Sequence, residues 1–135
     1  MPMVLDVSVA AAWFFPDEDD ATATQAALRL LDDTALVPAL FWFEIRNLLL
    51  VGERRGRVAR PDTARFLTHL DGLPLEVDHA PSSAALLTFA RTHGLSAYDA
   101  AYLELAQRRA AALVTLDRRL AAAALAEGVS LLGAS

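Results

Sequence analysis

The sequence has no lysine and no cysteine among its 135 residues, and its six glycines never fall in a GxGxxG spacing. Without lysine, a Walker A phosphate loop and Schiff-base chemistry are excluded, as is any receiver domain that needs a lysine. Without that glycine spacing there is no dinucleotide-binding fingerprint. Without cysteine there is no disulfide framework and no thiolate metal site, which fits a reducing cytosol. A chain of this length predicts one domain, residues 1–135, with a single sizeable core.

Long apolar runs are missing as well, because none approaches the roughly 18 residues that a membrane span needs. The first residues, MPMVLD, have no positively charged lead and reach Asp6 at once, which is unlike a signal peptide. We therefore expect a cytoplasmic protein with no membrane partner. The net charge of −5 argues against a general nucleic-acid-coating protein. Hydrophobic residues nevertheless make up 55% of the chain, which suggests that a partner covers some apolar surface.

What the sequence contains is an alternation of short β-type runs and longer helical patterns. Strands separated by helices predict an α/β domain, a three-layer α/β/α sandwich with a mainly parallel central sheet. The expected strands are 3–6, 35–38, 75–77, 112–116 and 129–132. The expected helices are 8–15, 18–32, 39–55, 61–70, 81–92, 97–110 and 118–127.

Carboxylates occur where these strands end and helices begin, which is where chemistry collects in parallel sheets. Asp6 closes the first strand and Asp117 follows the run ALVTL, so both are expected at one edge of the sheet. Ser8 and Thr115 flank that edge with hydroxyl groups. Asp99 lies in the first turn of the helix 97–110, but the sequence does not place this helix start at the same edge.

Each of these three aspartates also has a purely structural interpretation. The stretch SAYD resembles a capping box with Asp99 in the usual glutamate position, and for Asp99 alone capping is the better explanation. Asp117 is placed to cap the helix after it, and Asp6 could simply end a strand before a turn.

Glu44 is harder to explain structurally, because it lies in the apolar stretch ALFWFEIRNLLLV. Its neighbours one helical turn away include no basic residue, and in a helix 39–55 it is too deep to be a cap. An unpaired buried carboxylate costs several kcal/mol or takes up a proton, so a partner from elsewhere, most obviously a cation, is expected. Asn47 shares its face and could orient a water molecule or a phosphate.

Four acids that converge would repel one another unless a divalent ion lay between them. Oxygen ligands without cysteine or clustered histidine suit Mg²⁺ or Mn²⁺ rather than Zn²⁺. Such an ion can position a water molecule and stabilise charge on a phosphoryl oxygen.

Four stretches together resemble a known family, and they cover the chain from residue 4 to about 126. They are VLDVSVAAAW, FWFEIRNLL, LSAYDAAYLELA and LVTLDRRLAAAA, around Asp6, Glu44, Asp99 and Asp117. In order and spacing they resemble the acidic blocks of PIN-domain proteins, most closely the VapC-type toxins of bacterial toxin–antitoxin pairs. Each block alone is weak, but four in order within this length are fairly specific.

The resemblance implies a Mg²⁺- or Mn²⁺-dependent endoribonuclease, a homodimer, and a cognate VapB-like antitoxin that neutralises it. Asp6, Glu44, Asp99 and Asp117 match the family's catalytic metal-site positions, and Ser8, Asn47 and Thr115 match its supporting polar positions. A non-catalytic PIN-like module that binds RNA or protein is the alternative. An aspartyl-phosphate phosphatase ranks last, because Ser8 stands where a second acid is usual and no lysine is present.

The arginines of ERRGRVAR, residues 53–60, have two interpretations. A solvated helix end followed by a turn is slightly favoured, because basic residues are stabilising near a helix C-terminus. The alternative is that Arg54, Arg55 and Arg57 contact the RNA backbone as a local patch of positive charge.

Overall fold

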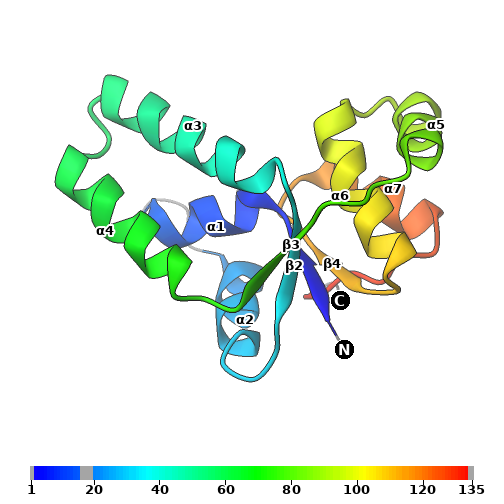
Figure 1. Cartoon of the computed structure of the whole chain (residues 1–135), viewed down its shortest axis with the longest axis horizontal. Helices are drawn as coiled ribbons and strands as arrows, with labels where there is room; N and C mark the ends of the chain where they lie inside the picture. The colour runs from blue at the N-terminus through cyan, green and yellow to red at the C-terminus, as the bar shows by residue number, and fades with distance from the viewer. Residues whose placement is uncertain (1, 16–19, 134–135) are drawn as a thin grey trace.

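The computed structural model describes residues 2–15 and 20–133, and its centre is a four-stranded sheet seen edge-on in Figure 1. The strands are β1 (Met3–Leu5), β2 (Ala35–Pro38), β3 (Leu75–Asp78) and β4 (Ala112–Val114). Their spatial order is β3-β2-β1-β4 and every pairing is parallel. The expected parallel sheet is therefore confirmed, and all four carboxyl ends lie at one edge.

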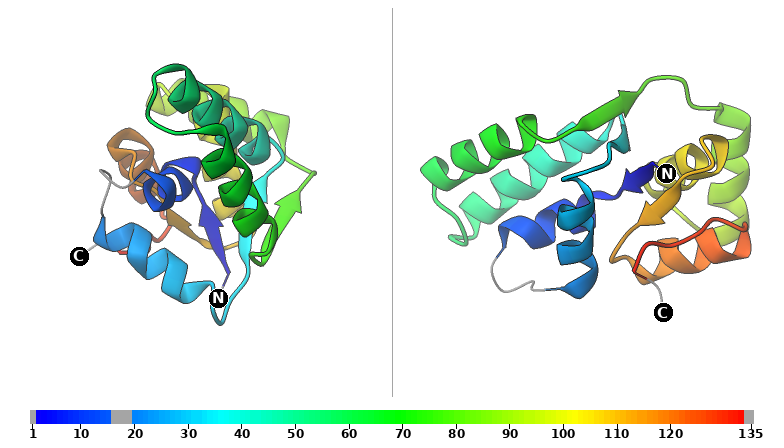
Figure 2. Two further views of the ribbon diagram at one scale, coloured as in Figure 1. Left: turned by 90° about the vertical axis from the view of Figure 1, so that its left-hand side faces the viewer. Right: turned by 90° about the horizontal axis from the view of Figure 1, so that it is seen from below.

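Seven helices in the described part of the chain cover the two faces of the sheet (Figures 1 and 2). On one side lie α1 (Val7–Phe14), α2 (Ala21–Arg29), α3 (Phe41–Arg54) and α4 (Arg60–Asp71). On the other side lie α5 (Ser83–His93), α6 (Ala97–Arg108) and α7 (Arg118–Ala126). The three-layer α/β/α sandwich is thus the observed architecture.

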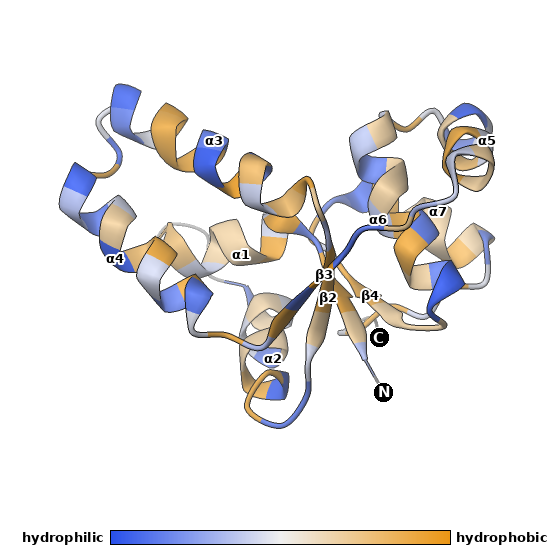
Figure 3. Cartoon of the chain, viewed as in Figure 1, coloured by the Kyte–Doolittle hydropathy of each residue, from blue (hydrophilic) through white to orange (hydrophobic). Residues whose placement is uncertain are grey.

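Alternation along the strands divides the interior into two cores. Met3 and Leu5 of β1 face the core with α1 to α4, whereas Val4 faces the core with α5 to α7. The strand registers place residues of the same core side by side, since Val4 pairs with Leu36 of β2 and with Leu113 of β4. Figure 3 shows that the helices carry both hydrophobic and hydrophilic residues along their length. Both faces are covered, which explains why β1 and β2 are apolar at every position.

Two expected elements differ from the structure. The run 129–132 forms only an isolated bridge, in which Leu131 pairs with Leu113 of β4, and not a fifth strand. The helix expected at 18–32 is observed at Ala21–Arg29, where Asp20 caps its start by accepting hydrogen bonds from the backbone N–H groups of Thr22 and Ala23. Positions 18 and 19 lie outside the described residues. Within the described residues, no helix is long and apolar enough to span a bilayer.

Candidate active site

Asp6 is the most deeply buried of the four predicted acids, with only 3% of its surface exposed. It follows β1 directly and stands at the N-cap position of α1. Its Oδ2 accepts hydrogen bonds from Ser8 Oγ at 2.5 Å and from Thr115 Oγ1 at 2.7 Å. Burial raises the pKa of Asp6, and the negative charge of Asp99 adds to the rise, although the two hydroxyl donors oppose it.

The two hydroxyls are themselves held by backbone groups after β4. Ser8 Oγ accepts from the Leu116 N–H at 3.0 Å, and Thr115 Oγ1 accepts from the Asp117 N–H at 3.0 Å. Each hydroxyl therefore uses its acceptor capacity on the backbone and its single proton on Asp6. The network of Ser8 and Thr115 joins the carboxyl ends of β1 and β4 and orients Asp6.

Glu44 lies in the first turn of α3, because that helix begins at Phe41 and not at residue 39. Glu44 is not a cap, as predicted, but it lies nearer to the positive end of the helix dipole than the expected bounds 39–55 placed it. Its side chain is partly buried and makes no capping bond. Burial raises the pKa of Glu44, and the negative charges of Asp6 and Asp99 raise it further.

The partner that Glu44 needs is present as a neutral group. Tyr102 of α6 donates a hydrogen bond from its hydroxyl to Glu44 Oε1 at 2.6 Å. Sequence reasoning missed Tyr102, although it stands one helical turn after Asp99 in the stretch LSAYDAAYLELA. A tyrosine on the buried face of a helix needs a hydrogen-bond acceptor, and that requirement was the available signal.

Asp99 lies at the same edge of the sheet as the other acids, which the sequence alone did not settle. Ser96 caps α6 and accepts from the Asp99 N–H at 3.1 Å, so half of the capping box is observed. Burial raises the pKa of Asp99 and the charge of Asp117 adds to the rise, against the bond to Ser96 and the positive charge of Arg119. Capping and membership of an acidic site therefore coexist at Asp99.

Asp117 also combines both roles. Its Oδ1 accepts from the backbone N–H groups of Arg119 and Leu120 at 2.9 and 3.1 Å, so it is the N-cap of α7 as one interpretation predicted. Its charge reaches Asp99, and its own N–H binds Thr115. Asn47 is exposed on α3, one turn beyond Glu44.

The four acids suit a divalent cation in chemistry, since they offer only oxygen ligands and the negative charges of neighbouring acids help to raise the pKa of Asp6, Glu44 and Asp99. Within the described residues, however, no three acidic or histidine side chains are already arranged around one ion position. The acids are close enough to repel and must adjust their side chains to share a cation.

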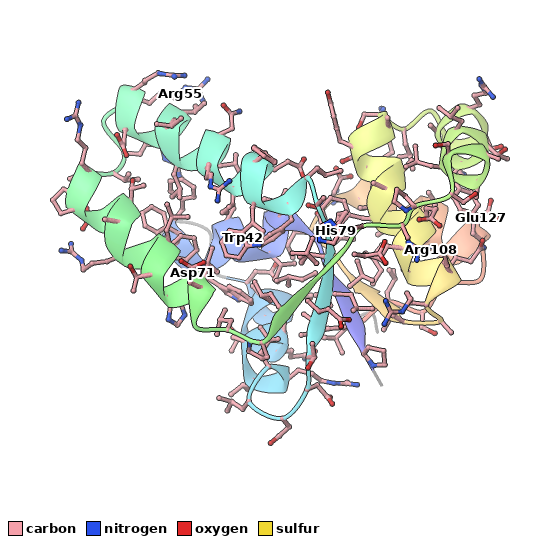
Figure 4. The ribbon with its side chains drawn as sticks, viewed as in Figure 1. Trp42, Arg55, Asp71, His79, Arg108 and Glu127 are labelled. Carbon is pink, nitrogen blue, oxygen red and sulfur yellow. The ribbon has the colours of Figure 1, made fainter. Side chains whose placement is uncertain are left out.

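The arginines divide into two groups. Arg108 binds Glu104 and Asp78, with its shortest contacts at 2.8 and 2.6 Å, and so ties α6 to β3 (Figure 4). By contrast, Arg55 and Arg57 line a groove of about 390 Å³ between α1 and α3 that also includes Ser8 and Leu116. Arg57 stacks 4.2 Å above the ring of Phe15. Arg54 lies in the last turn of α3, outside this groove.

The fold and the site together describe an all-parallel α/β/α domain with four carboxylates near the carboxyl edge of its sheet. The chain belongs to the PIN-domain family, because the family model for the PIN domain matches residues 3–126. Ribonuclease VapC3 of Pyrobaculum aerophilum is 32% identical over 124 residues, which is 90% of this chain and 93% of that protein.

Solved structures share the fold. The crystal structure of PAE2754 from Pyrobaculum aerophilum has a TM-score of 0.72 and 25% identity, covering 91% of this chain and 84% of that one. The crystal structure of FitAcB from Neisseria gonorrhoeae has a TM-score of 0.68 at 16% identity, covering 98% of this chain and 97% of that one. VapBC2 from Rickettsia felis, bound to a DNA fragment from their promoter, gives 0.66 at 15% identity, with 97% of each covered.

Proposed function

We propose that this chain is a metal-dependent endoribonuclease, the toxin component of a type II toxin–antitoxin pair. The observation that carries the proposal is that acids at the starts of α1, α3, α6 and α7 gather at one edge of the sheet, where their charges act on one another. Gathering negative charge in this way is unfavourable unless a cation compensates it. The 32% identity to a ribonuclease along nearly the whole of both chains supports the same activity.

Asp6, Glu44 and Asp99 would hold Mg²⁺ or Mn²⁺, with Asp117 joining directly or through water. When bound, the ion supplies Lewis acidity at the phosphodiester and lowers the pKa of a water molecule beside it. The burial of Asp6 keeps bulk water from one of the carboxylates. Ser8 and Thr115 hold its Oδ2 in place, so that the carboxylate keeps one orientation. Asn47, exposed on α3 one turn beyond Glu44, would orient the phosphate.

RNA is proposed to follow the groove between α1 and α3, away from the acids. Ser8 and Leu116 line it beside the site, and Arg55 and Arg57 line it near the end of α3. Figure 4 shows Arg55 at the tip of α3, far from the sheet. Two arginines here would offset the net charge of −5 locally and contact the sugar–phosphate backbone. Arg54 is the third proposed contact, at the same helix end.

The proposed partners are a VapB-like antitoxin and a second copy of the chain, in the cytoplasm. Phe43 is 71% exposed and Leu50 is 47% exposed on the outer side of α3. Exposed large apolar side chains of this kind are commonly covered by partners. The resemblance of the four acidic stretches to VapC-type toxins supports the choice of partners.

The test compares RNA cleavage by the wild type, Asp99→Asn and a control, Asp71→Asn, with Mg²⁺, with Mn²⁺ and with a chelator. Asp71 is exposed at the end of α4, before β3, so the same chemical change is made away from the acids (Figure 4). We expect metal-dependent cleavage that Asp99→Asn abolishes and Asp71→Asn retains. RNA binding without cleavage in the wild type would instead favour the non-catalytic module, whereas cleavage that persists in the chelator would refute the metal dependence.

A further inference from the structure

Tyr102 links the two cores of the protein through a single hydroxyl group. Its side chain is fully buried in the core formed with α5 to α7. Its hydroxyl reaches across the carboxyl edge of the sheet and donates to Glu44 Oε1 at 2.6 Å. Glu44 belongs to α3, on the other side of the sheet, so this bond fixes the distance between two helices that carry acids of the site.

Packing alone does not account for a tyrosine at this position. A phenylalanine would fill the same apolar space without placing a hydroxyl where it must find a partner. The partner is a carboxylate of the proposed site. Burial raises the pKa of Tyr102, and the bond to Glu44 and the charge of Asp6 raise it further, against the backbone N–H of Val7. The hydroxyl is the donor in the bond to the Glu44 carboxylate.

Glu44 needs such a donor. Its side chain has three rotatable bonds, and the negative charges of Asp6 and Asp99 favour its rotation away from them. The residues one turn away on α3 that contact the cores, Phe41 and Leu48, are apolar and offer no hydrogen bond. The described hydrogen bond to this carboxylate comes from Tyr102.

We propose that Tyr102 is a positioning residue, whose hydroxyl holds the Glu44 carboxylate toward Asp6 and Asp99 so that the three can share a divalent cation. The inference rests on the proposed function, and it adds a residue that touches neither substrate nor metal. Groups that orient metal ligands typically contribute 10- to 100-fold to metal affinity or activity. We expect an effect in this range.

The experiment compares Tyr102→Phe with Tyr98→Phe. Tyr98 stands one helical turn earlier on α6 and is 64% exposed, so the control removes the same hydroxyl from the same helix. Three quantities are measured: Mn²⁺ binding from the electron paramagnetic resonance signal of free Mn²⁺, the metal concentration that half-saturates RNA cleavage, and the thermal unfolding temperature without metal. Tyr102→Phe should weaken Mn²⁺ binding 10- to 100-fold and raise the half-saturating metal concentration equally, with cleavage largely restored at saturating metal. Tyr98→Phe should match the wild type.

A purely structural role gives a different result. A lowered unfolding temperature with unchanged Mn²⁺ affinity and unchanged metal dependence would overturn the proposal. If the wild type neither binds Mn²⁺ nor cleaves RNA, the proposed function itself has failed. Crystal structures of metal-free wild type and Tyr102→Phe then decide the positioning role alone: a Glu44 carboxylate that stays in place without the hydroxyl refutes it, and one that turns away from Asp6 supports it.

Discussion

The metal-free protein should lose stability as the pH rises from 4.5 to 7.5, which is opposite to ordinary acid denaturation. Asp6, Glu44 and Asp99 all have pKa values above their ordinary values of 3.8, 4.5 and 3.8, because of burial and mutual repulsion. Between the ordinary and the raised pKa, the folded state holds a proton that the unfolded chain has lost. Stability from these groups is therefore complete below the ordinary pKa and is lost as the pH rises through the raised one.

The magnitude follows from the protons involved. One proton held only by the folded state changes the free energy of unfolding by about 1.4 kcal/mol per pH unit. Glu44 and Asp99 are partly exposed, so solvent screens part of their repulsion. If the folded state holds on average half a proton more than the unfolded chain across these three pH units, the loss is about 2 kcal/mol. Asp78, whose pKa Arg108 holds below its usual range, acts in the opposite direction only at more acidic pH.

The assay is urea unfolding in a chelator at pH 4.5 to 7.5, for the wild type and Glu44→Gln. The difference between the two cancels the titration of histidines and other shared groups. The wild type should lose stability relative to Glu44→Gln as the pH rises, and Mg²⁺ at about ten times its dissociation constant should return about 1.4 kcal/mol to the wild type. A difference that is constant across this range would refute the convergence of the acids.

Further predictions concern single side chains. Glu44→Gln should keep or raise metal-free stability at neutral pH and lose metal binding in titration calorimetry; a large loss of metal-free stability would mean that the charge itself has a structural role. Thr115→Val should cost about 1 to 3 kcal/mol in chemical denaturation and reduce cleavage, because Asp6 loses a donor and a backbone N–H loses its acceptor. An unchanged denaturation midpoint would contradict it. Arg108→Met should cost about 3 to 5 kcal/mol in thermal unfolding, because Glu104 is only 2% exposed and would be left unpaired. A loss below about 1 kcal/mol would mean that water replaces the arginine.

The sheet and two of its acids could be predicted from sequence because they depend on local pattern. Apolar runs separated by helical segments indicate parallel strands, and parallel strands bring their carboxyl ends to one edge. Asp6 follows β1 directly and Asp117 comes shortly after β4, so their common edge follows from connectivity alone. The strand predicted at 129–132 was wrong. Its apolar pattern is typical of a strand, but only one of its residues pairs with β4, as an isolated bridge.

The pairing of Glu44 with Tyr102 could not be predicted in the same way. The pairing depends on how α3 and α6 are placed relative to each other across the sheet. The local periodicity of the sequence does not encode the distance between these two helices. The start of α3 was also misplaced, because Ala39 and Leu40 continue the apolar pattern although the helix begins at Phe41. Once Glu44 is in the first turn, its position near a helix N-terminus becomes favourable for a negative charge.

The position of the acids at the seam between two cores explains how the fold tolerates them. Asp6 directly follows β1, whose residues alternate between the two cores, so apolar packing on both sides of the sheet fixes the position of its backbone. The hydroxyls of Ser8 and Thr115 and the hydroxyl of Tyr102 then provide neutral donors, which stabilise carboxylates without introducing a competing positive charge. Arginines at the same positions would neutralise the acids permanently and leave nothing for a divalent ion to compensate. Neutral donors keep the acids oriented and still mutually repulsive, which is the arrangement that favours cation binding over a closed ion-pair network.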